Sequence, residues 1–474
     1  MSTQARAGSG WLATATALRR AYASGELSPV EVMSATLERA STLGATLNAF
    51  MTIDADPALS AAEAAAAELH DHGVPEDRPL FGIPVSVKDL TATAGLRTTR
   101  GSLATSDHVP TADAPAVARI RRAGGIVFAK TNTSEAGWKA DAGNRLIGPT
   151  SNPWDLGRSS GGSSGGAAAA VAAGIGPLAT GTDGAGSIRI PAAFCGVVGF
   201  KPTAGLIAYV PASADRLAHL GPIARSVEDA VLLTSVMAGA DDRDPFSVSI
   251  GPCNPGAEPQ ACTRIGMSIN LGYGDPSEAA VRATRAAGAA LADQGHVVVE
   301  LDQGIADPYP ILETLMAGAE AASYAEGFER LRPLLDPGHA RQIELGRRLT
   351  GLELAVAAER RLALNDDVHE LMRDVDLLLT PTMPTGPFEL GLDGPAGSAG
   401  LSWTSFTYPF NLTGQPAITL PAGFDEDGLP LGIQLVARRF DDAVLLSVAR
   451  SYEHARSWSG GYEALWRDLE GGAH

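Results

Sequence analysis

Apolar stretches of two kinds alternate along much of the chain, and this alternation predicts an α/β core. Residues 82–88 alternate apolar and polar positions as a strand does, and the stretch ends at Lys88. Residues 117–123 repeat apolar positions at helical spacing, and residues 126–129 form a short apolar run that indicates a buried strand. Strands that alternate with helices in this way are typical of a sheet packed against helices.

The same pattern continues towards both ends of the chain. Ser28 and Pro29 form a capped helix start inside a helical region at 11–70. Residues 240–263 and 385–400 are rich in Gly, Pro or Asp, which predicts surface connections. Further helices are predicted at 164–175, 227–238, 279–294, 442–453 and most of 309–375, and further strands at 265–269, 297–301, 375–379, 418–421 and 432–436. Because the chain shows no internal repeat and no linker, we expect one compact unit.

Composition and charge exclude some classes of binding partner for this protein. Of 474 residues, 45% are hydrophobic and 19% are charged, and the formal net charge of −18 would repel nucleic acid and anionic membranes. No stretch reaches the roughly 20 apolar residues of a membrane span. Near the N-terminus, Arg19 and Arg20 interrupt a short apolar stretch, unlike a signal peptide. We therefore expect a cytoplasmic protein that binds neither nucleic acid nor a membrane.

Cysteine and histidine give no sign of metal or cofactor chemistry. Cys195, Cys253 and Cys262 are an odd number without framework spacing, which is typical of a reducing compartment. Cys195 lies in an apolar run and is interpreted as a buried core thiol. No histidine stands at metal-ligand spacing from a cysteine or an aspartate, and a Ser-His-Asp triad has no local support. We expect no metal and no organic cofactor.

Two stretches rich in glycine and serine carry the strongest chemical signal. They are Gly161-Gly-Ser-Ser-Gly-Gly166 and Asp183-Gly-Ala-Gly-Ser187. Glycine lets the backbone approach a ligand closely, and the successive N–H groups of such a turn form an anion-binding nest. A serine nucleophile beside these donors is what acyl transfer requires. Taken singly, the stretches are also compatible with a tight turn, a flexible linker or a phosphate loop, although the Gly-Lys-Ser/Thr ending of the phosphate loop is missing.

Lys88 is the candidate base. It ends the strand predicted at 82–88 and precedes Asp89. A charged lysine at such a position acts as a salt-bridge partner, whereas a desolvated lysine with a depressed pKa acts as a base. The segment alone leaves both alternatives open.

Together these segments resemble the amidase signature family of enzymes. The resemblance rests on residues 161–166, 181–191 and 195–203, and it extends from about residue 10 to about 455. Flanking segments that agree are 47–50, 82–89, 129–135, 152–154 and 409–416. The resemblance implies a single α/β domain over 1–474, with a central mixed sheet covered by helices on both faces. Its expected parts are an N-terminal helical region at about 10–75, a catalytic core at 76–230, a helical region with the substrate pocket at 240–400, and a C-terminal return at 401–474.

The resemblance also implies a triad of two serines and a lysine. Ser187 would be the nucleophile, Ser163 a bridging serine after a cis peptide bond, and Lys88 the base. The remaining assignments are an oxyanion hole from the backbone N–H groups of Gly184, Ala185, Gly186 and Ser187, and structural support from Asp183, Arg189 and Ser164. Glycine at 184 and alanine at 185 depart from the commonest pattern, but the backbone donors are kept. The choice of Ser163 over Ser164 rests on the resemblance.

Bulky apolar side chains are expected around the substrate. The pocket residues expected from the sequence are Gly137, Trp138, Tyr209, Tyr309, Leu312 and Met316, with Trp403 and Phe406 on the other side. This mixture predicts an aryl or alkyl group beside the scissile bond of an amide or carbamate, with water as the second reactant and activated esters as further substrates. The alternative for Trp138 and Tyr309 is an ordinary core position. A monomer and a homodimer are both compatible with the resemblance.

Two other functions share these motifs. The first is the glutaminase subunit of a transfer-RNA-dependent amidotransferase, which usually carries an acidic residue five positions before the proline that leads into Asn-Leu. Thr404 stands there, ahead of Pro409, so a partner for the ammonium group of glutamine is missing. The second is an inactive, binding-only relative, which is disfavoured because Lys88, Ser163 and Ser187 are all present.

Overall fold

One mixed β-sheet organises the part of the chain that the structure describes. The computed structural model describes residues 12–249 and 262–471, so Cys253, residues 1–11 and half of the connection expected at 240–263 lie outside the described residues. The strands of the sheet are β1 (Phe50–Ile53), β2 (Pro84–Lys88), β3 (Ile126–Thr131), β6 (Leu178–Asp183), β7 (Val198–Lys201), β8 (His219–Ala224), β9 (Arg264–Met267), β10 (Val297–Glu300), β11 (Leu377–Pro381), β12 (Ala417–Phe424) and β13 (Pro430–Ala437). A separate hairpin pairs β4 (Ser151–Asn152) with β5 (Asp155–Ser159).

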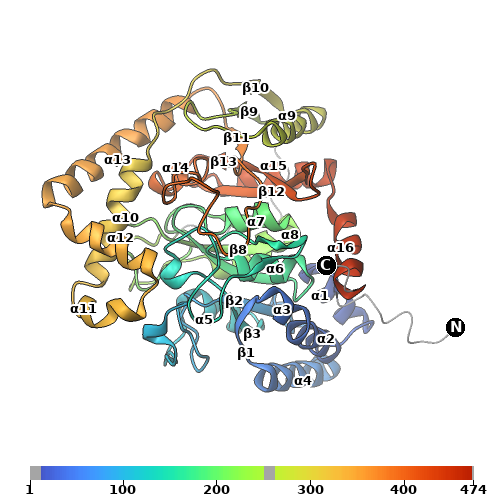
Figure 1. The fold of residues 1–474 in the computed structure, drawn as a ribbon. Coiled ribbons are helices and arrows are strands. Elements are labelled where there is room, and N and C mark those ends of the chain that lie inside the picture. The colour runs from blue at the N-terminus through green and yellow to red at the C-terminus, as the bar shows by residue number, and fades with distance from the viewer. Residues whose placement is uncertain (1–11, 250–261, 472–474) are drawn as a thin grey trace.

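The strand order is β1-β3-β2-β6-β8-β7-β12-β13-β11-β9-β10. In Figure 1 the sheet extends from β1, beside the blue N-terminal helices at the bottom, to β10 at the top. Parallel pairs lie towards both edges of the sheet: β2 pairs with β3 and β6 near one edge, and β9 pairs with β10 and β11 at the other. The central strands β8, β7, β12 and β13 pair antiparallel. The predicted α/β fold with a central mixed sheet is therefore confirmed.

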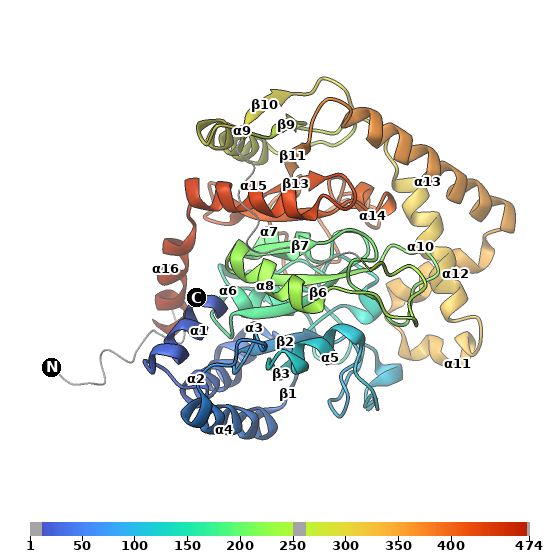
Figure 2. The same ribbon diagram turned by 180° about the vertical axis from the view of Figure 1, so that it is seen from behind.

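Helices cover both faces of this sheet, and its inner strands are accordingly buried on both sides. Every residue of β2, β3 and β6 is buried. The helices are α1 (Ala15–Ser24), α2 (Pro29–Ser41), α3 (Leu43–Leu47), α4 (Ala55–His72), α5 (Pro115–Arg122), α6 (Gly165–Ala172), α7 (Arg189–Cys195), α8 (Val227–Met237), α9 (Glu278–Asp293), α10 (Tyr309–Ser323), α11 (Phe328–Leu331), α12 (Pro337–Arg348), α13 (Gly351–Leu371), α14 (Pro409–Leu412), α15 (Asp442–Ala455) and α16 (Ser459–Gly471). Helices α5, α8, α9 and α15 share one core cluster, and α4, α6 and α16 share another. Figure 2 shows α8 and α15 in front of the strands.

Helices α10 to α13 form a lobe beside the sheet. They project to the left in Figure 1 and to the right in Figure 2. Helix α10 packs against α12 and α13, and its Leu312 is buried with Leu364 of α13. This lobe is the part of the molecule that faces the carboxyl ends of β2 and β6, where the candidate site lies.

The C-terminal helix α16 packs against the helix that follows the first glycine-serine stretch. Trp466 donates its indole N–H to the carbonyl of Ala172 at 2.8 Å, and Tyr462 donates its hydroxyl to the carbonyl of Gly196 at 2.7 Å. Arg39 of α2 forms an ion pair with Glu470. Segments from both ends of the chain therefore meet beneath α6.

Most elements lie where the sequence predicts them. At the start of α2, the Ser28 hydroxyl accepts from the N–H of Glu31, whose carboxylate accepts from the N–H of Ser28, as the capping prediction requires. Strands β1, β6, β7 and β8 are not among the predicted elements. The last three carry Gly, Thr or Pro within their runs, which weakens the strand pattern, and β1 interrupts a region predicted as helical. No helix within the described residues is both long and apolar enough to cross a membrane.

Helix α6 is packed so closely that its second residue must be glycine. A Cβ atom on Gly166 would overlap the N–H of Asn132 and lie 2.5 Å from the carbonyl oxygen of Ala49. The neighbouring backbone cannot yield as a flexible side chain does. We predict that Gly166→Ala lowers the free energy of unfolding by about 1–3 kcal/mol, measured by urea denaturation.

The matched control is Gly351→Ala, because a Cβ atom on Gly351 meets nothing within 4 Å. That substitution is expected to leave stability unchanged or to raise it by up to about 1 kcal/mol. Equal stabilities of the two variants would contradict the close packing of α6.

Candidate active site

Two neighbouring parallel strands end at the same place and bring Lys88 and Asp183 together. Strands β2 and β6 pair with Val87 opposite Thr180, so their carboxyl ends coincide. Lys88 is the last residue of β2, and Asp183 is the last residue of β6. The carboxyl edge of parallel strands is where α/β proteins generally place their sites.

Lys88 is fully buried and surrounded by hydroxyl groups. Its Nζ lies 2.8 Å from Ser163 Oγ, 2.8 Å from Ser164 Oγ and 2.9 Å from Thr182 Oγ1. Burial lowers the pKa of Lys88 well below its ordinary value, and the charge of Asp183 opposes this only in part. The environment therefore favours an uncharged amine at the end of β2.

The two serines that contact Lys88 have different surroundings. The hydroxyl of Ser164 donates to the carbonyl of Thr182 at 3.2 Å and accepts from its N–H at 3.3 Å. Within the described residues, the Ser163 hydroxyl has no hydrogen-bond partner except Lys88, and it lines a cavity together with Ser187. The peptide bond between Gly162 and Ser163 is cis.

A cavity of about 440 Å³ opens onto Ser187. Ser163, Thr182 and Gly184 line its base, and Ser187 is 9% exposed there. The carbonyl of Ser187 accepts from the N–H of Ser164 at 3.1 Å, which ties the two glycine-serine stretches to each other. The cavity thus brings a serine hydroxyl, a second serine and a buried amine to one place.

The turn from Gly184 to Ser187 forms a nest of N–H groups, with one donor already engaged. The N–H of Gly186 donates to Asp183 Oδ1 at 2.7 Å. Among the residues that the structure describes, the N–H groups of Gly184, Ala185 and Ser187 have no partner. Gly186 has φ 127°, and a Cβ atom there would overlap the Thr407 side chain. The geometry leaves three donors for an anion, whereas the sequence resemblance implies four.

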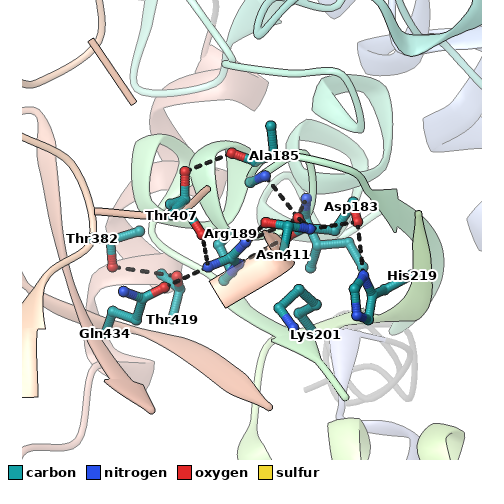
Figure 3. Close-up of polar contacts among 12 residues, drawn as sticks. Asp183, Ala185, Arg189, Lys201, His219, Thr382, Thr407, Asn411, Thr419 and Gln434 are labelled. Atoms are coloured by element: carbon teal, nitrogen blue, oxygen red, sulfur yellow. Dashed lines mark hydrogen bonds and ion pairs between the residues drawn. The ribbon is translucent and has the colours of Figure 1, made fainter. Parts of the chain in front are cut away.

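A buried ion pair holds this turn (Figure 3). Asp183 and Arg189 are completely buried, and the guanidinium binds the carboxylate in two places, with Nε 2.9 Å from Oδ2 and Nη2 3.0 Å from Oδ1. Burial alone would raise the pKa of Asp183, but the charge of Arg189 holds it well below its usual range. Asp183 therefore remains ionised and fixes the N–H groups of the turn.

Residues from the C-terminal quarter complete the coordination of Arg189. Its Nη1 donates to the carbonyl of Thr407 at 2.9 Å and to Gln434 Oε1 at 2.7 Å. Its Nη2 donates to Asn411 Oδ1 at 2.5 Å, and Asn411 in turn donates to the carbonyl of Asp183 at 2.8 Å. The Thr407 hydroxyl donates to the carbonyl of Ala185 at 2.6 Å. The turn that carries Ser187 is thus held from two distant parts of the chain.

Two further titratable side chains lie behind the turn. The Lys201 amine donates to the carbonyl of Gln415, and His219 Nδ1 lies 2.7 Å from the carbonyl of Leu217. Figure 3 shows the same ring nitrogen of His219 directed at the carbonyl of Asp183, 3.3 Å away. Burial lowers the pKa of both groups well below their ordinary values. Burial thus disfavours the charged form of both groups.

The residues expected to line the substrate pocket are divided between two spaces. Gly137, Tyr209 and Met316 line the cavity at Ser187. Trp138, Tyr309 and Leu312 line a neighbouring groove of about 660 Å³, which shares Met316 with the cavity.

Two expected pocket residues lie in the core instead. Trp403 packs against Phe194 and Phe388, with ring centroids 6.3 and 5.4 Å away, and Phe406 is fully buried in the cluster around α14. Neither is among the residues that line the cavity, and the residue that reaches the nest from this segment is Thr407. Here the expectation from the sequence differs from the structure. Cys195 is buried as expected.

Several residues of the site are missing from the sequence interpretation. They are Thr182, Thr407, Asn411 and Gln434 at the turn, and Arg100, Glu320, Tyr324 and His339 at the cavity wall. Gln434 had a usable signal, since it is a polar residue inside an apolar strand. His339 had none, because its partners are distant in sequence. In the part of the chain that the structure describes, no group of three His, Cys, Asp or Glu residues is arranged to hold a metal ion.

Comparisons with known proteins identify the family of the chain. The family model Amidase matches residues 31–446. The chain is 37% identical to an acylamidase of Rhodococcus erythropolis over 95% of this chain and 96% of the relative. It is 35% identical to one of the subunits of the glutamyl-tRNA(Gln) amidotransferase of Roseiflexus sp. (strain RS-1), over 93% and 96%. The crystal structure of a bacterial aryl acylamidase superposes with a TM-score of 0.89 at 27% identity, over 96% of this chain and 98% of that one.

The buried ion pair yields a stability prediction. We predict that Arg189→Met lowers the free energy of unfolding by about 3–5 kcal/mol, because the Asp183 carboxylate stays buried without its partner. Urea denaturation at neutral pH measures the difference. Arg285→Met is the matched control, since its ion pair with Glu300 is exposed, and we expect little change there. A loss at Arg189 no larger than that at Arg285 would contradict the role of the pair.

Proposed function

The chain belongs to the amidase family and is an amidohydrolase, and on this basis we propose that it cleaves the C–N bond of small amides with Ser187 as nucleophile, Ser163 as proton relay and Lys88 as base. The observation that carries this proposal is the 2.8 Å contact between Lys88 Nζ and Ser163 Oγ at the base of the cavity that Ser187 lines. A buried, uncharged amine beside a hydroxyl is the arrangement of a base and its relay.

The hydrogen-bond pattern supports Ser163 over Ser164 as the relay. A neutral lysine amine has two N–H donors and one lone pair. The proton of Ser164 is used by the carbonyl of Thr182, so Ser164 accepts from Lys88. The hydroxyl of Ser163 is free to donate to the lone pair and to accept a proton from Ser187 in the cavity.

The reaction then follows as two acyl transfers. Ser187 Oγ attacks the amide carbon, its proton passes to Ser163, and the proton of Ser163 passes to Lys88. The N–H groups of Gly184, Ala185 and Ser187 donate to the oxyanion that forms. The relay returns the proton to the leaving nitrogen as the C–N bond breaks. Water then attacks the acyl-enzyme by the same route and releases the acid.

The substrate class that we propose is an amide with an aryl or alkyl group beside the scissile bond. Tyr209, Met316 and Tyr324 give the cavity apolar walls, and its volume of about 440 Å³ suits a small molecule. The acylamidase and aryl acylamidase relatives support the same class. Aryl carbamates and activated esters are further substrates in this proposal, because both present a carbonyl carbon to the same nucleophile.

The amidotransferase alternative requires recognition of glutamine. Thr404 is fully buried and donates its hydroxyl to the carbonyl of Leu401 at 2.9 Å, so it offers no carboxylate to an ammonium group in the cavity. This supports hydrolysis of small amides over glutamine, although proteins of that class are comparably similar in sequence.

We predict that the purified protein hydrolyses a p-nitroanilide or a p-nitrophenyl carbamate, and that Ser187→Ala lowers kcat by at least about 10⁴-fold. Absorbance at the p-nitroaniline or p-nitrophenol band measures the rate, and free glutamine is tested in parallel. Cys195→Ala is the matched control, because that buried thiol plays no part in the proposal. Glutamine turnover without anilide or carbamate turnover would favour the amidotransferase alternative.

The proposed base also predicts a pH dependence. The pKa of Lys88 is lowered, and only the neutral amine accepts a proton, so kcat/KM should rise with pH and level off well below the ordinary lysine value of 10.5. Lys88→Arg should abolish activity because arginine remains protonated. Lys130→Met is the control, since burial lowers the pKa of this neighbouring lysine to about 7. If the rise of kcat/KM with pH disappears in Lys130→Met, the titrating group is Lys130 instead of Lys88.

A further inference from the structure

A buried bridge of two carboxylates and one imidazole lies beside the catalytic cavity. His339 of α12 is completely buried, with Nδ1 2.9 Å from Glu135 Oε2 and Nε2 3.0 Å from Glu320 Oε2. Glu135 belongs to the 3₁₀ turn Glu135–Gly137 of the catalytic core, and Glu320 belongs to α10. The bridge therefore joins the helical lobe to the core through three separate elements.

The bridge requires the charged form of the imidazole. A neutral imidazole has one N–H and one lone pair, so it can satisfy a carboxylate at one nitrogen alone. Burial by itself would lower the pKa of His339, but the hydrogen bond to Glu135 and the ion-pair contact with Glu320 raise it to about 9. The imidazole of His339 thus lies between two carboxylates at the wall of the cavity.

On the core side, the bridge fixes the turn that borders the proposed relay. Glu135 also accepts from the Ser102 hydroxyl at 2.5 Å and from the N–H of Asp336 at 2.6 Å. The next residues are Ala136 and Gly137, with φ 51° and 80°, and both line the cavity. A Cβ atom on Gly137 would lie 3.2 Å from Ser163 Oγ.

On the lobe side, the bridge fixes the wall that faces Ser187. Met316, Ala319 and Glu320 of α10 line the cavity, as does His339 itself. The Trp138 ring stacks on His339 at 6.3 Å with an interplanar angle of 8°, and a Cβ atom on Gly338 would overlap that ring. Helix α12 can therefore approach the core this closely only with glycine beside the histidine.

We propose that His339, through its bridge to Glu135 and Glu320, is a positioning residue that sets the distance between the α10 wall of the cavity and the catalytic serines. The residue touches neither the reacting atoms nor the relay, so it acts on how a bulky substrate is held. This inference rests on the proposed function of Ser187. The binding of substrates that fill the cavity as far as α10 depends on the bridge, whereas the binding of a short aliphatic amide does not.

The pH dependence of the bridge follows from its partners. The groups that face His339 are Glu135 from the turn, Glu320 from α10 and Tyr324, whose ring lies 5.4 Å away. Burial and Glu135 raise the pKa of Tyr324 to about 12, so it stays neutral while His339 titrates. Because the pKa of His339 is raised from 6.5 to about 9, its contribution is complete below pH 6.5 and is lost as the pH rises through about 9.

The test compares a bulky anilide with propionamide in His339→Gln and Glu320→Gln. We expect KM for the anilide to rise by about fivefold or more in both variants, with kcat and all propionamide constants within about twofold of wild type. His369→Gln is the control, since His369 is exposed on α13. Glu320→Gln removes the charge that pairs with His339 but keeps the size of the side chain, so it weakens the bridge and preserves the fold if His339→Gln does not. An unchanged KM for the anilide, or an equal loss of kcat on both substrates, would overturn the inference.

Hydrogen exchange of the free protein tests the bridge independently of catalysis. Amides of α10 and α12 should exchange faster in both variants than in wild type at pH 7, while those of β2 and β6 should not change. If Ser187→Ala turns over substrate as fast as the wild type, the proposed function is refuted. The exchange data would then still show whether the bridge holds α10 and α12. Unchanged exchange in α10 and α12 would refute the bridge even in an active enzyme.

Discussion

The ion pair of Asp183 and Arg189 is the interaction on which the site depends. It fixes the turn from Gly184 to Ser187 from below, since Asp183 accepts from the N–H of Gly186 and its charge is maintained by the guanidinium. A buried pair of this kind contributes little net stability, because desolvation offsets much of the attraction. Its value lies in geometry, because each partner is satisfied in one arrangement of the surrounding backbone. The N–H groups of Gly184, Ala185 and Ser187 remain without a partner among the described residues.

The same burial has opposite effects on the charges of neighbouring groups. Asp183 keeps its charge because Arg189 binds it in two places, whereas Lys88, Lys201 and His219 lack such partners and tend towards neutrality. Direct contact with a counter-charge, more than depth, separates the two outcomes. A site that needs one permanent anion and one neutral amine within the same small volume obtains both from this difference.

The sequence predicted the α/β fold and most of the helices, because apolar spacing and caps such as Ser28 are local signals. It did not predict β6, β7 and β8, whose glycine, threonine and proline residues obscure the strand pattern, although they form the middle of the sheet. For the site, the motifs around Ser163 and Ser187 were visible as short stretches. The roles of Asn411, Gln434 and His339 were not, because each depends on a partner more than 190 residues away in sequence. The hydrogen bond from the Gly186 N–H to the Asp183 carboxylate also could not be predicted, because it depends on how the turn folds back in space.

The coordination of Arg189 has a consequence for the order in which the molecule becomes functional. Lys88, Ser163 and Ser187 all lie in the first 190 residues, but three partners of Arg189 follow residue 400. A chain emerging from the ribosome therefore holds the reactive hydroxyl long before it can order the turn around it. The turn that carries Ser187 therefore gains its full set of contacts only after the C-terminal strands have docked. A fragment that ends before residue 400 would lack all three of these contacts to Arg189.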